Sequence, residues 1–141
     1  MPGTKTFVDT NVLVYAHDTS AGRKRDRALE VIQELWNTGT GVMSTQVLQE
    51  LFVSLTQKIP KPIDGRKARS IVEDLCTWEI VTNDEHAILE AIDLKIKYQL
   101  SFWDSLILEA AGRSGATILY SEDLSHGQQV EGLTIVNPFE V

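Results

Sequence analysis

Residues 117–123 read Thr-Ile-Leu-Tyr-Ser-Glu-Asp, an apolar and β-rich run that ends in polar residues. The start of the chain shows the same order, because Thr6-Phe7-Val8 is followed by Asp9-Thr10-Asn11. Short apolar runs with polar ends are typical of strands buried in a parallel sheet. Ligands of open α/β sheets bind beyond the carboxyl ends of the strands. The two runs therefore predict strands that, as neighbours, bring Asp9 and Asp123 to one crevice.

The rest of the chain alternates between strand and helix patterns. The other expected strands are residues 42–43, 79–81 and 133–136. The expected helices cover 25–37 and 45 to about 58, and three more begin at Asp64, at Asn83 or Asp84, and at Ser101. This alternation predicts one α/β domain over residues 1–141, with a parallel sheet of about five short strands covered by helices on both faces.

The composition excludes several classes of protein. The chain has 141 residues, of which 43% are hydrophobic and 23% charged, as in ordinary globular domains. Cys76 is the only cysteine, which excludes a disulfide framework and a cysteine-based zinc site. The longest apolar run is Val12–Ala16, far short of the roughly 20 residues of a membrane-spanning helix. Residues 1–5 show no signal-peptide pattern, so we expect a cytoplasmic protein without membrane contact.

The positive charges are concentrated in two stretches. The net charge of −7 argues against a protein that coats nucleic acid through bulk electrostatics. The two basic clusters are Arg23, Lys24, Arg25 and Arg27, and then Lys58, Lys61, Arg66, Lys67 and Arg69. Each cluster is either a solvated helix face or an arm that contacts phosphate beside an acidic centre. Charge alone leaves both interpretations open.

Two further acids occupy unusual positions in expected helices. Glu50 lies at the edge of an apolar stripe, and Asp104 lies in the first turn of its helix. Both have structural explanations, because Glu50 can extend into solvent and Asp104 can complement the helix dipole for about 0.3–1 kcal/mol. Asp9 and Asp123 are equally compatible with tight turns. Position alone therefore suggests a joint acidic site without establishing it.

Four segments, in order and with matching spacing, resemble the PIN-domain family. They are Phe7–Leu13, Ser44–Leu51, Ser101–Ile107 and Ser121–Leu124. Each segment is a weak motif alone, but together they span nearly the whole chain and are most similar to toxins of the VapC type from toxin–antitoxin pairs. Ser121 takes a place often held by Thr in that family.

The resemblance implies a PIN-like three-layer α/β/α fold and endonucleolytic cleavage of RNA with Mg²⁺ or Mn²⁺. It implies catalytic carboxylates at Asp9, Glu50, Asp104 and Asp123. Clustered carboxylates without a cysteine ligand suit such hard cations. A metal-bound water attacks the phosphate in reactions of this class, and the number of metal ions, one or two, stays open.

The implied roles differ between the acids. Asp9 and Asp104 are expected to bind the metal, and Asp123 to bind it directly or through water. Glu50 either completes the coordination sphere or positions the attacking water. The residues expected to hold the carboxylates or water by hydrogen bonds are Asn11 and Ser121.

Several neighbours of these motifs are expected to serve the structure. Thr10 is expected to belong to the turn, and Glu122 to point away from the crevice. His17 is expected at the surface. Trp103 is expected to pack in the core, with stacking on an RNA base as the alternative.

The resemblance also implies partners. It implies an RNA substrate, a homodimer and a cognate antitoxin that enters the active-site groove. On this interpretation the two basic clusters grip the RNA backbone. The alternative is a PIN scaffold that binds RNA or protein without cleavage. A phosphatase that begins with Asp-x-Asp is disfavoured because Asn11 cannot act as a general acid. A P-loop nucleotide site is excluded because the chain has no P-loop motif.

Overall fold

The computed structural model describes residues 4–140. Within this range one sheet has the strand order β3-β2-β1-β4-β6-β5. The strands are β1 (Thr6–Val8), β2 (Gly41–Ser44), β3 (Glu79–Val81), β4 (Ile118–Tyr120), β5 (Gln129–Val130) and β6 (Leu133–Val136). All neighbours pair in parallel except β5, which is antiparallel to β6. The predicted parallel sheet of about five strands is confirmed, with one antiparallel strand added.

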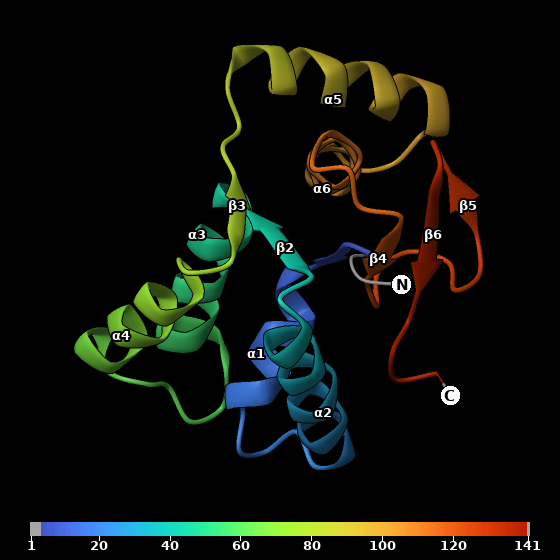
Figure 1. Ribbon diagram of the computed structural model, residues 1–141. Helices are drawn as coiled ribbons and strands as arrows, with labels where there is room; N and C mark the ends of the chain where they lie inside the picture. Colours follow the sequence, from blue (N-terminus) through green and yellow to red (C-terminus); the bar gives the residue numbers. More distant parts are fainter. Residues whose placement is uncertain (1–3, 141) are drawn as a thin grey trace.

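Helices cover both faces of this sheet. They are α1 (Thr10–His17), α2 (Arg23–Thr38), α3 (Thr45–Val53), α4 (Gly65–Leu75), α5 (Glu85–Tyr98) and α6 (Phe102–Arg113). A π-helical turn, η1 (Ser54–Lys58), extends α3. Figure 1 shows α6, with α5 outside it, on one side of the sheet and α1 with α2 on the other. The predicted three-layer α/β/α fold is confirmed. None of the helices within residues 4–140 has the length and apolar character to span a membrane.

The register of β1 and β4 aligns their carboxyl ends. Val8 pairs with Tyr120, and the Asp9 N–H donates to the Tyr120 carbonyl at 3.0 Å. The chain runs from β1 to β2 on one side, whereas β4 lies on the other side of β1. Such a reversal of strand order is where α/β sheets open a crevice for a ligand. The residues after β1 and β4 therefore meet at this point, as the sequence predicted.

Helix α1 has no counterpart among the expected helix ranges. It begins directly after β1, with Asp9 as its N-cap. Val12, Leu13, Val14 and Ala16 are all buried. A helix that is apolar on most sides shows no polar face, so its sequence lacks the amphipathic spacing that marks surface helices. The apolar run Val12–Ala16 therefore forms the middle of the buried helix α1.

Strand β5 was also not expected. It pairs with β6 through a two-residue turn in which Glu131 and Gly132 have φ of 51° and 82°. Two consecutive left-handed residues form the turn that suits the twist of a hairpin. Glu is an uncommon residue at such a position, so local sequence patterns do not predict this turn.

The amino end of β2 depends on glycine. Added to Gly41, a Cβ atom would overlap the ring of Trp78. The Trp78 ring packs edge-on against Trp36, with ring centroids 5.5 Å apart. Trp78 therefore covers this end of the sheet only because position 41 has no side chain.

Candidate active site

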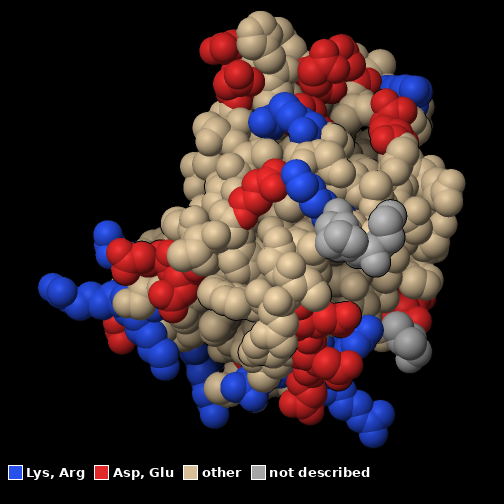
Figure 2. Space-filling view, viewed as in Figure 1, with Lys and Arg blue, Asp and Glu red and all other residues tan. Residues whose placement is uncertain are grey.

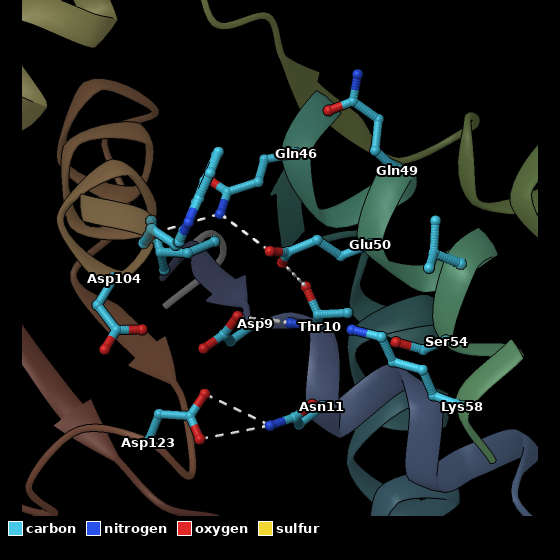
Figure 3. Close-up of a pocket in the computed structure, with 13 residues that line it drawn as sticks. Asp9, Thr10, Asn11, Gln46, Gln49, Glu50, Ser54, Lys58, Asp104 and Asp123 are labelled. Atoms are coloured by element: carbon cyan, nitrogen blue, oxygen red, sulfur yellow. Dashed lines mark hydrogen bonds between the residues drawn. The ribbon is translucent and has the colours of Figure 1, made fainter. Parts of the chain in front are cut away.

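The four predicted acids line one pocket at the carboxyl ends of β1 and β4. This carboxylate pocket has a volume of about 340 Å³. The acids are Asp9, Glu50, Asp104 and Asp123. They come from four places: the end of β1, the middle of α3, the first turn of α6 and the loop after β4. Figure 3 shows their carboxylates around a common space. The fold thus brings together acids from opposite ends of the sequence, Asp9 and Asp123.

Asp9 is the most deeply placed of these acids, with 6% of its surface exposed. Its Oδ1 accepts from the Thr10 N–H at 2.7 Å, and its Oδ2 accepts from the Ser121 hydroxyl at 3.0 Å. The pKa of Asp9 is raised to about 7, mainly by burial and to a lesser extent by the nearby Asp123 and Glu50 carboxylates, while these two hydrogen bonds act in the opposite direction. A buried acid with no cation to pair it is costly, which is typical of a site that binds something.

Ser121 connects the first and last acids of the pocket. Its buried hydroxyl donates to Asp9, and its oxygen accepts from the Asp123 N–H at 3.2 Å. Asn11 Nδ2 lies 3.4 Å from both carboxylate oxygens of Asp123. Burial and the charges of Asp104, Glu122 and Glu50 raise the pKa of Asp123. Ser121 and Asn11 therefore occupy positions from which they hold Asp9 and Asp123.

Glu50 is held by two neutral donors. The Thr10 hydroxyl donates to Oε1 at 2.7 Å, and Gln46 Nε2 donates to Oε2 at 3.3 Å. Thr10 thus belongs to the site as well as to the turn after β1, which corrects the expectation that it serves the turn alone.

Gln46 is a site residue that the sequence analysis missed. It is 5% exposed and lines the carboxylate pocket. Its Nε2 also lies 3.3 Å from the Trp103 carbonyl, so it links α3 to α6. Within residues 4–140 its Oε1 is buried without a hydrogen-bond partner. The signal was present, because Gln46 and Glu50 are four residues apart and share one helix face.

Asp104 sits in the first turn of α6, where the Asp104 N–H donates to the Ser101 hydroxyl at 3.0 Å. This cap fixes the start of the helix and leaves the carboxylate free to face the pocket. The neighbouring Trp103 is 61% exposed and also lines the pocket. The expectation that Trp103 packs in the core is wrong, because α6 presents this ring to the rim of the pocket.

The donor set fits a divalent cation by type. Four carboxylates provide only oxygen ligands, which hard cations prefer. Among residues 4–140, no group of three or more His, Cys, Asp or Glu side chains lies close enough together to hold an ion as it stands. Neighbouring carboxylates disfavour one another's charged forms, and a bound cation would offset that repulsion.

The predicted basic residues fall in three places. Lys58 lines the carboxylate pocket, and Figure 3 shows its side chain extending toward Thr10 and Asn11. Three others line a second cavity, namely Arg23, Lys24 and Arg27. The remainder lie on or near α4 and at the start of α2, namely Lys61, Arg66, Lys67, Arg69 and Arg25. Figure 2 shows Lys and Arg side chains along the lower edge, over α4 and the start of α2.

His17 lies near residues of both basic clusters. It is half-buried at the end of α1, which corrects the expectation of a surface residue. Burial lowers the pKa of His17, and the nearby Arg25 and Lys67 lower it further. Because both cations act on one imidazole, the two clusters, distant in sequence, approach each other here.

Glu122 points away from the pocket, as predicted. Its carboxylate accepts from the Tyr15 hydroxyl at 2.6 Å and forms an ion pair with Lys24. Lys24 and Tyr15 lower the pKa of Glu122 against the effect of its burial. Glu122 therefore remains ionised outside the cluster of four acids.

Comparisons with known proteins agree with this geometry. A family model for the PIN domain matches residues 6–128. No curated protein gives a significant match to the sequence. A toxin–antitoxin complex from Klebsiella pneumoniae contains a similar chain, with 18% identity, a TM-score of 0.73, and coverage of 97% of this chain and 100% of that chain.

Two further solved structures share the fold. The Mycobacterium tuberculosis toxin VapC20, described as cleaving the sarcin–ricin loop, has 16% identity and a TM-score of 0.65 over 84% of this chain and 90% of that chain. Rickettsia felis VapBC2, bound to a promoter DNA fragment, has 18% identity and a TM-score of 0.66 over 92% and 96%. At such identities the likeness shows a common fold.

Proposed function

The chain belongs to the PIN domain family, and we propose on this premise that it is a metal-dependent endoribonuclease. The observation that carries the proposal is the convergence of Asp9, Glu50, Asp104 and Asp123 on one pocket. Four acids from separate elements, with a pKa of about 7 at the buried one, suit a nuclease site better than four unrelated structural roles.

The proposed cofactor is Mg²⁺ or Mn²⁺, held by Asp9, Asp104 and Asp123. Such an ion lowers the pKa of a bound water, orients the scissile phosphate and stabilises the leaving oxygen. Ser121 and the Thr10 N–H fix the two oxygens of Asp9, so this carboxylate has one orientation. Asn11 restrains Asp123 in the same way.

Glu50 is proposed to orient the attacking water. Thr10 occupies its Oε1, and Gln46 contacts its Oε2. These donors hold the carboxylate toward the pocket, where Oε2 can accept a proton from water. Lys58 at the mouth of the pocket supplies a positive charge for a phosphate that approaches four acids. The exposed ring of Trp103 supplies a stacking surface for an unpaired base.

A toxin of a toxin–antitoxin pair is the proposed biological role. The solved structures with this fold include toxin–antitoxin complexes, which supports a cognate antitoxin as the partner. An Arg or Lys from that partner would pair with the carboxylates. A homodimer is the proposed assembly, because α5 exposes the apolar side chains of Leu89, Ile92 and Ile96 along one face. Replacement of Ile96 by Glu is expected to yield monomers in analytical ultracentrifugation.

A non-catalytic scaffold that binds RNA or protein is the alternative. The four acids argue against it, because a scaffold has no need to bury Asp9 beside two other acids at a raised pKa. The two functions differ in their response to Asp9→Asn, which removes cleavage from an enzyme and leaves a binding module active.

The test is cleavage of a mixed cellular RNA pool by the purified chain with Mg²⁺, with Mn²⁺ and with EDTA. Asp9→Asn is the test variant, and Asp93→Asn, an exposed acid on α5, is the matched control. We expect metal-dependent fragments from the wild type and the control and none from Asp9→Asn. Intact RNA in both metals, with folded protein free of a bound inhibitor, would favour the scaffold.

A further inference from the structure

A second cavity lies beside the carboxylate pocket and has no role in the chemistry described above. It has a volume of about 230 Å³ and is lined by Arg23, Lys24, Arg27, Pro138 and Phe139. Three cations and an aromatic ring around one hollow are unusual in a chain with a net charge of −7. We propose that this basic–aromatic pocket is a subsite for the RNA strand, in which Arg23 and Lys24 bind a backbone phosphate and Phe139 stacks on a base.

The geometry of α1 places this pocket next to the acids. Asn11 and Tyr15 are four residues apart and therefore lie on one face of the helix, about 6 Å apart along its axis. Asn11 contacts Asp123 in the carboxylate pocket, and Tyr15 donates to Glu122 beside it. The basic–aromatic pocket is thus one helical turn from the carboxylate pocket, where the nucleotides next to a scissile phosphate would pass.

The aromatic and cationic walls are held in place by contacts within the chain. Arg27 Nε donates to the Pro138 carbonyl at 2.8 Å, which fixes the C-terminal segment against α2. The Phe139 ring packs edge-on against Tyr15, with ring centroids 5.1 Å apart. Lys24 Nζ lies 4.9 Å from the Tyr15 centroid and 5.8 Å from that of Phe139. Arg27 therefore holds Pro138 and Phe139 at the side of the pocket, and Lys24 Nζ lies near both aromatic rings.

The charges at this position favour an anion. The first turn of α2 carries Arg23, Lys24 and Arg25 beside the acid Asp26, so cations outnumber acids although cations are disfavoured at the positive end of a helix. The N-cap is Gly22, and in the described part of the chain no side chain caps this helix. A phosphate would offset the repulsion between these cations and the helix dipole. Lys24 pairs with Glu122, so Arg23 is the principal contact and Lys24 the second.

An RNA strand fits these walls better than an acidic peptide. Phosphate groups match the cations, and an unpaired base can stack on the part of the half-buried Phe139 ring that lines the pocket, which a run of Asp or Glu would leave unused. This inference rests on the proposed nuclease function, because it requires an RNA strand to lie across the four acids.

The test is binding of a 12-nucleotide single-stranded RNA, labelled with fluorescein, measured by anisotropy in EDTA at several salt concentrations. Arg23→Gln is expected to weaken binding about threefold to tenfold and to reduce the slope of log K against log salt by about 0.7. Phe139→Leu is expected to weaken binding about fivefold or more with little change in slope, because stacking is uncharged. Lys95→Gln, on the distant α5, is the charge-matched control and is expected to bind as the wild type does.

Two results would overturn the inference. One is an Arg23→Gln variant with the affinity and salt slope of Lys95→Gln. The other is displacement of the RNA by poly-glutamate as effectively as by unlabelled RNA, which would point to an acidic protein segment. Circular dichroism and melting curves identify a Phe139→Leu variant that fails to fold, and Arg23→Gln then decides the question alone because Arg23 is exposed.

Cleavage assays distinguish failure of this subsite from failure of the proposed nuclease function. With a 12-mer, Arg23→Gln is expected to show a raised KM and little change in kcat, whereas Lys95→Gln keeps the wild-type values of both. Cleavage without dependence on Arg23 would overturn the subsite and leave the nuclease. Binding that depends on Arg23, with no cleavage by any form, would overturn the nuclease and leave an RNA-binding subsite.

Discussion

At the amino ends of the central strands, Trp78 packs over Gly41 and the acid Glu79 pairs with Lys5 at 3.0 Å. At the carboxyl ends of β1 and β4, Asp9 is buried, and among residues 4–140 its hydrogen-bond partners are the neutral donors Thr10 and Ser121. The amino end is therefore arranged for packing, whereas the carboxyl end keeps four acids in mutual repulsion. A chain that satisfies its charges at one end of the sheet and not at the other indicates where its ligand binds.

The largest expected effect is loss of catalysis at the carboxyl end. Asp104→Asn removes one charge from the pocket but keeps the shape of the side chain and the cap at Ser101. We expect RNA cleavage to fall about a thousandfold or more, since the ion's charge stabilisation is worth several kcal/mol. Asp93→Asn is expected to retain full activity. Equal cleavage rates of Asp104→Asn and Asp93→Asn in single-turnover assays would show that Asp104 has no role in catalysis.

The cost of burying Asp9 should appear as a dependence of stability on pH. Its pKa of about 7 lies above the ordinary value of 3.8, so the folded state binds more protons between these pH values. The free energy of unfolding of the metal-free protein therefore falls as pH rises from 4 to 7. Above pH 7, Asp9→Asn is expected to be more stable than the wild type by about 2–4 kcal/mol.

Urea denaturation in EDTA at pH 4.5 and pH 8 measures this difference. The advantage of Asp9→Asn is expected to vanish at the lower pH. Asp93→Asn, whose acid is exposed, should track the wild type at both pH values. An Asp9→Asn variant less stable than the wild type at pH 8 would mean that the Asp9 carboxylate stabilises the fold, contrary to this prediction.

A substitution at the amino ends of the central strands is expected to lower the free energy of unfolding and to leave RNA cleavage by the folded protein unchanged. Gly41→Ala forces the Trp78 ring to move, and we expect a loss of about 1–3 kcal/mol in the free energy of unfolding. Gly112→Ala is the matched control, because nothing lies within 4 Å of its added methyl group in α6. That control is expected to be neutral or stabilising by up to about 1 kcal/mol. A fall in cleavage per folded Gly41→Ala molecule would show that the two ends are coupled.

The smallest expected effect concerns Ser121, which holds Asp9 and the Asp123 backbone. Ser121→Ala removes one hydroxyl, and we expect cleavage to fall about tenfold as the carboxylates lose their orientation. Ser121→Thr keeps the hydroxyl and is expected to restore most of the rate. Failure of the Thr variant to recover activity would indicate a packing role at this buried position.

The sequence predicted the sheet because its strands are apolar runs with polar ends, and register then aligned β1 with β4. That rule brings Asp9 and Asp123 to one crevice only if the two strands are neighbours, and the pairing of β1 with β4 meets this condition. Glu50 and Asp104 needed the family resemblance, because a helical acid at the edge of a stripe looks the same whether it faces solvent or a pocket. The sequence of α1 lacks the amphipathic spacing that predicts a surface helix, because this helix is buried on most sides.

Side-chain environments could not be predicted from local patterns. Trp103 resembles a core residue in the sequence, yet α6 turns it to the rim of the pocket. Gln46 carries no motif of its own and acquires its role from contacts with Glu50 and the Trp103 carbonyl, across two helices. Such roles depend on tertiary contacts.

Mn²⁺ binding at pH 8, measured by electron paramagnetic resonance of the free ion, tests the four-acid site most directly. We expect the wild type and Asp93→Asn to bind Mn²⁺ and Asp104→Asn to bind it far more weakly. We also expect wild-type affinity to fall as pH drops below about 7, because Asp9 must lose its proton to bind the ion. Equal binding by all three proteins, or none by the wild type, would contradict the claim that these acids form one metal-dependent site.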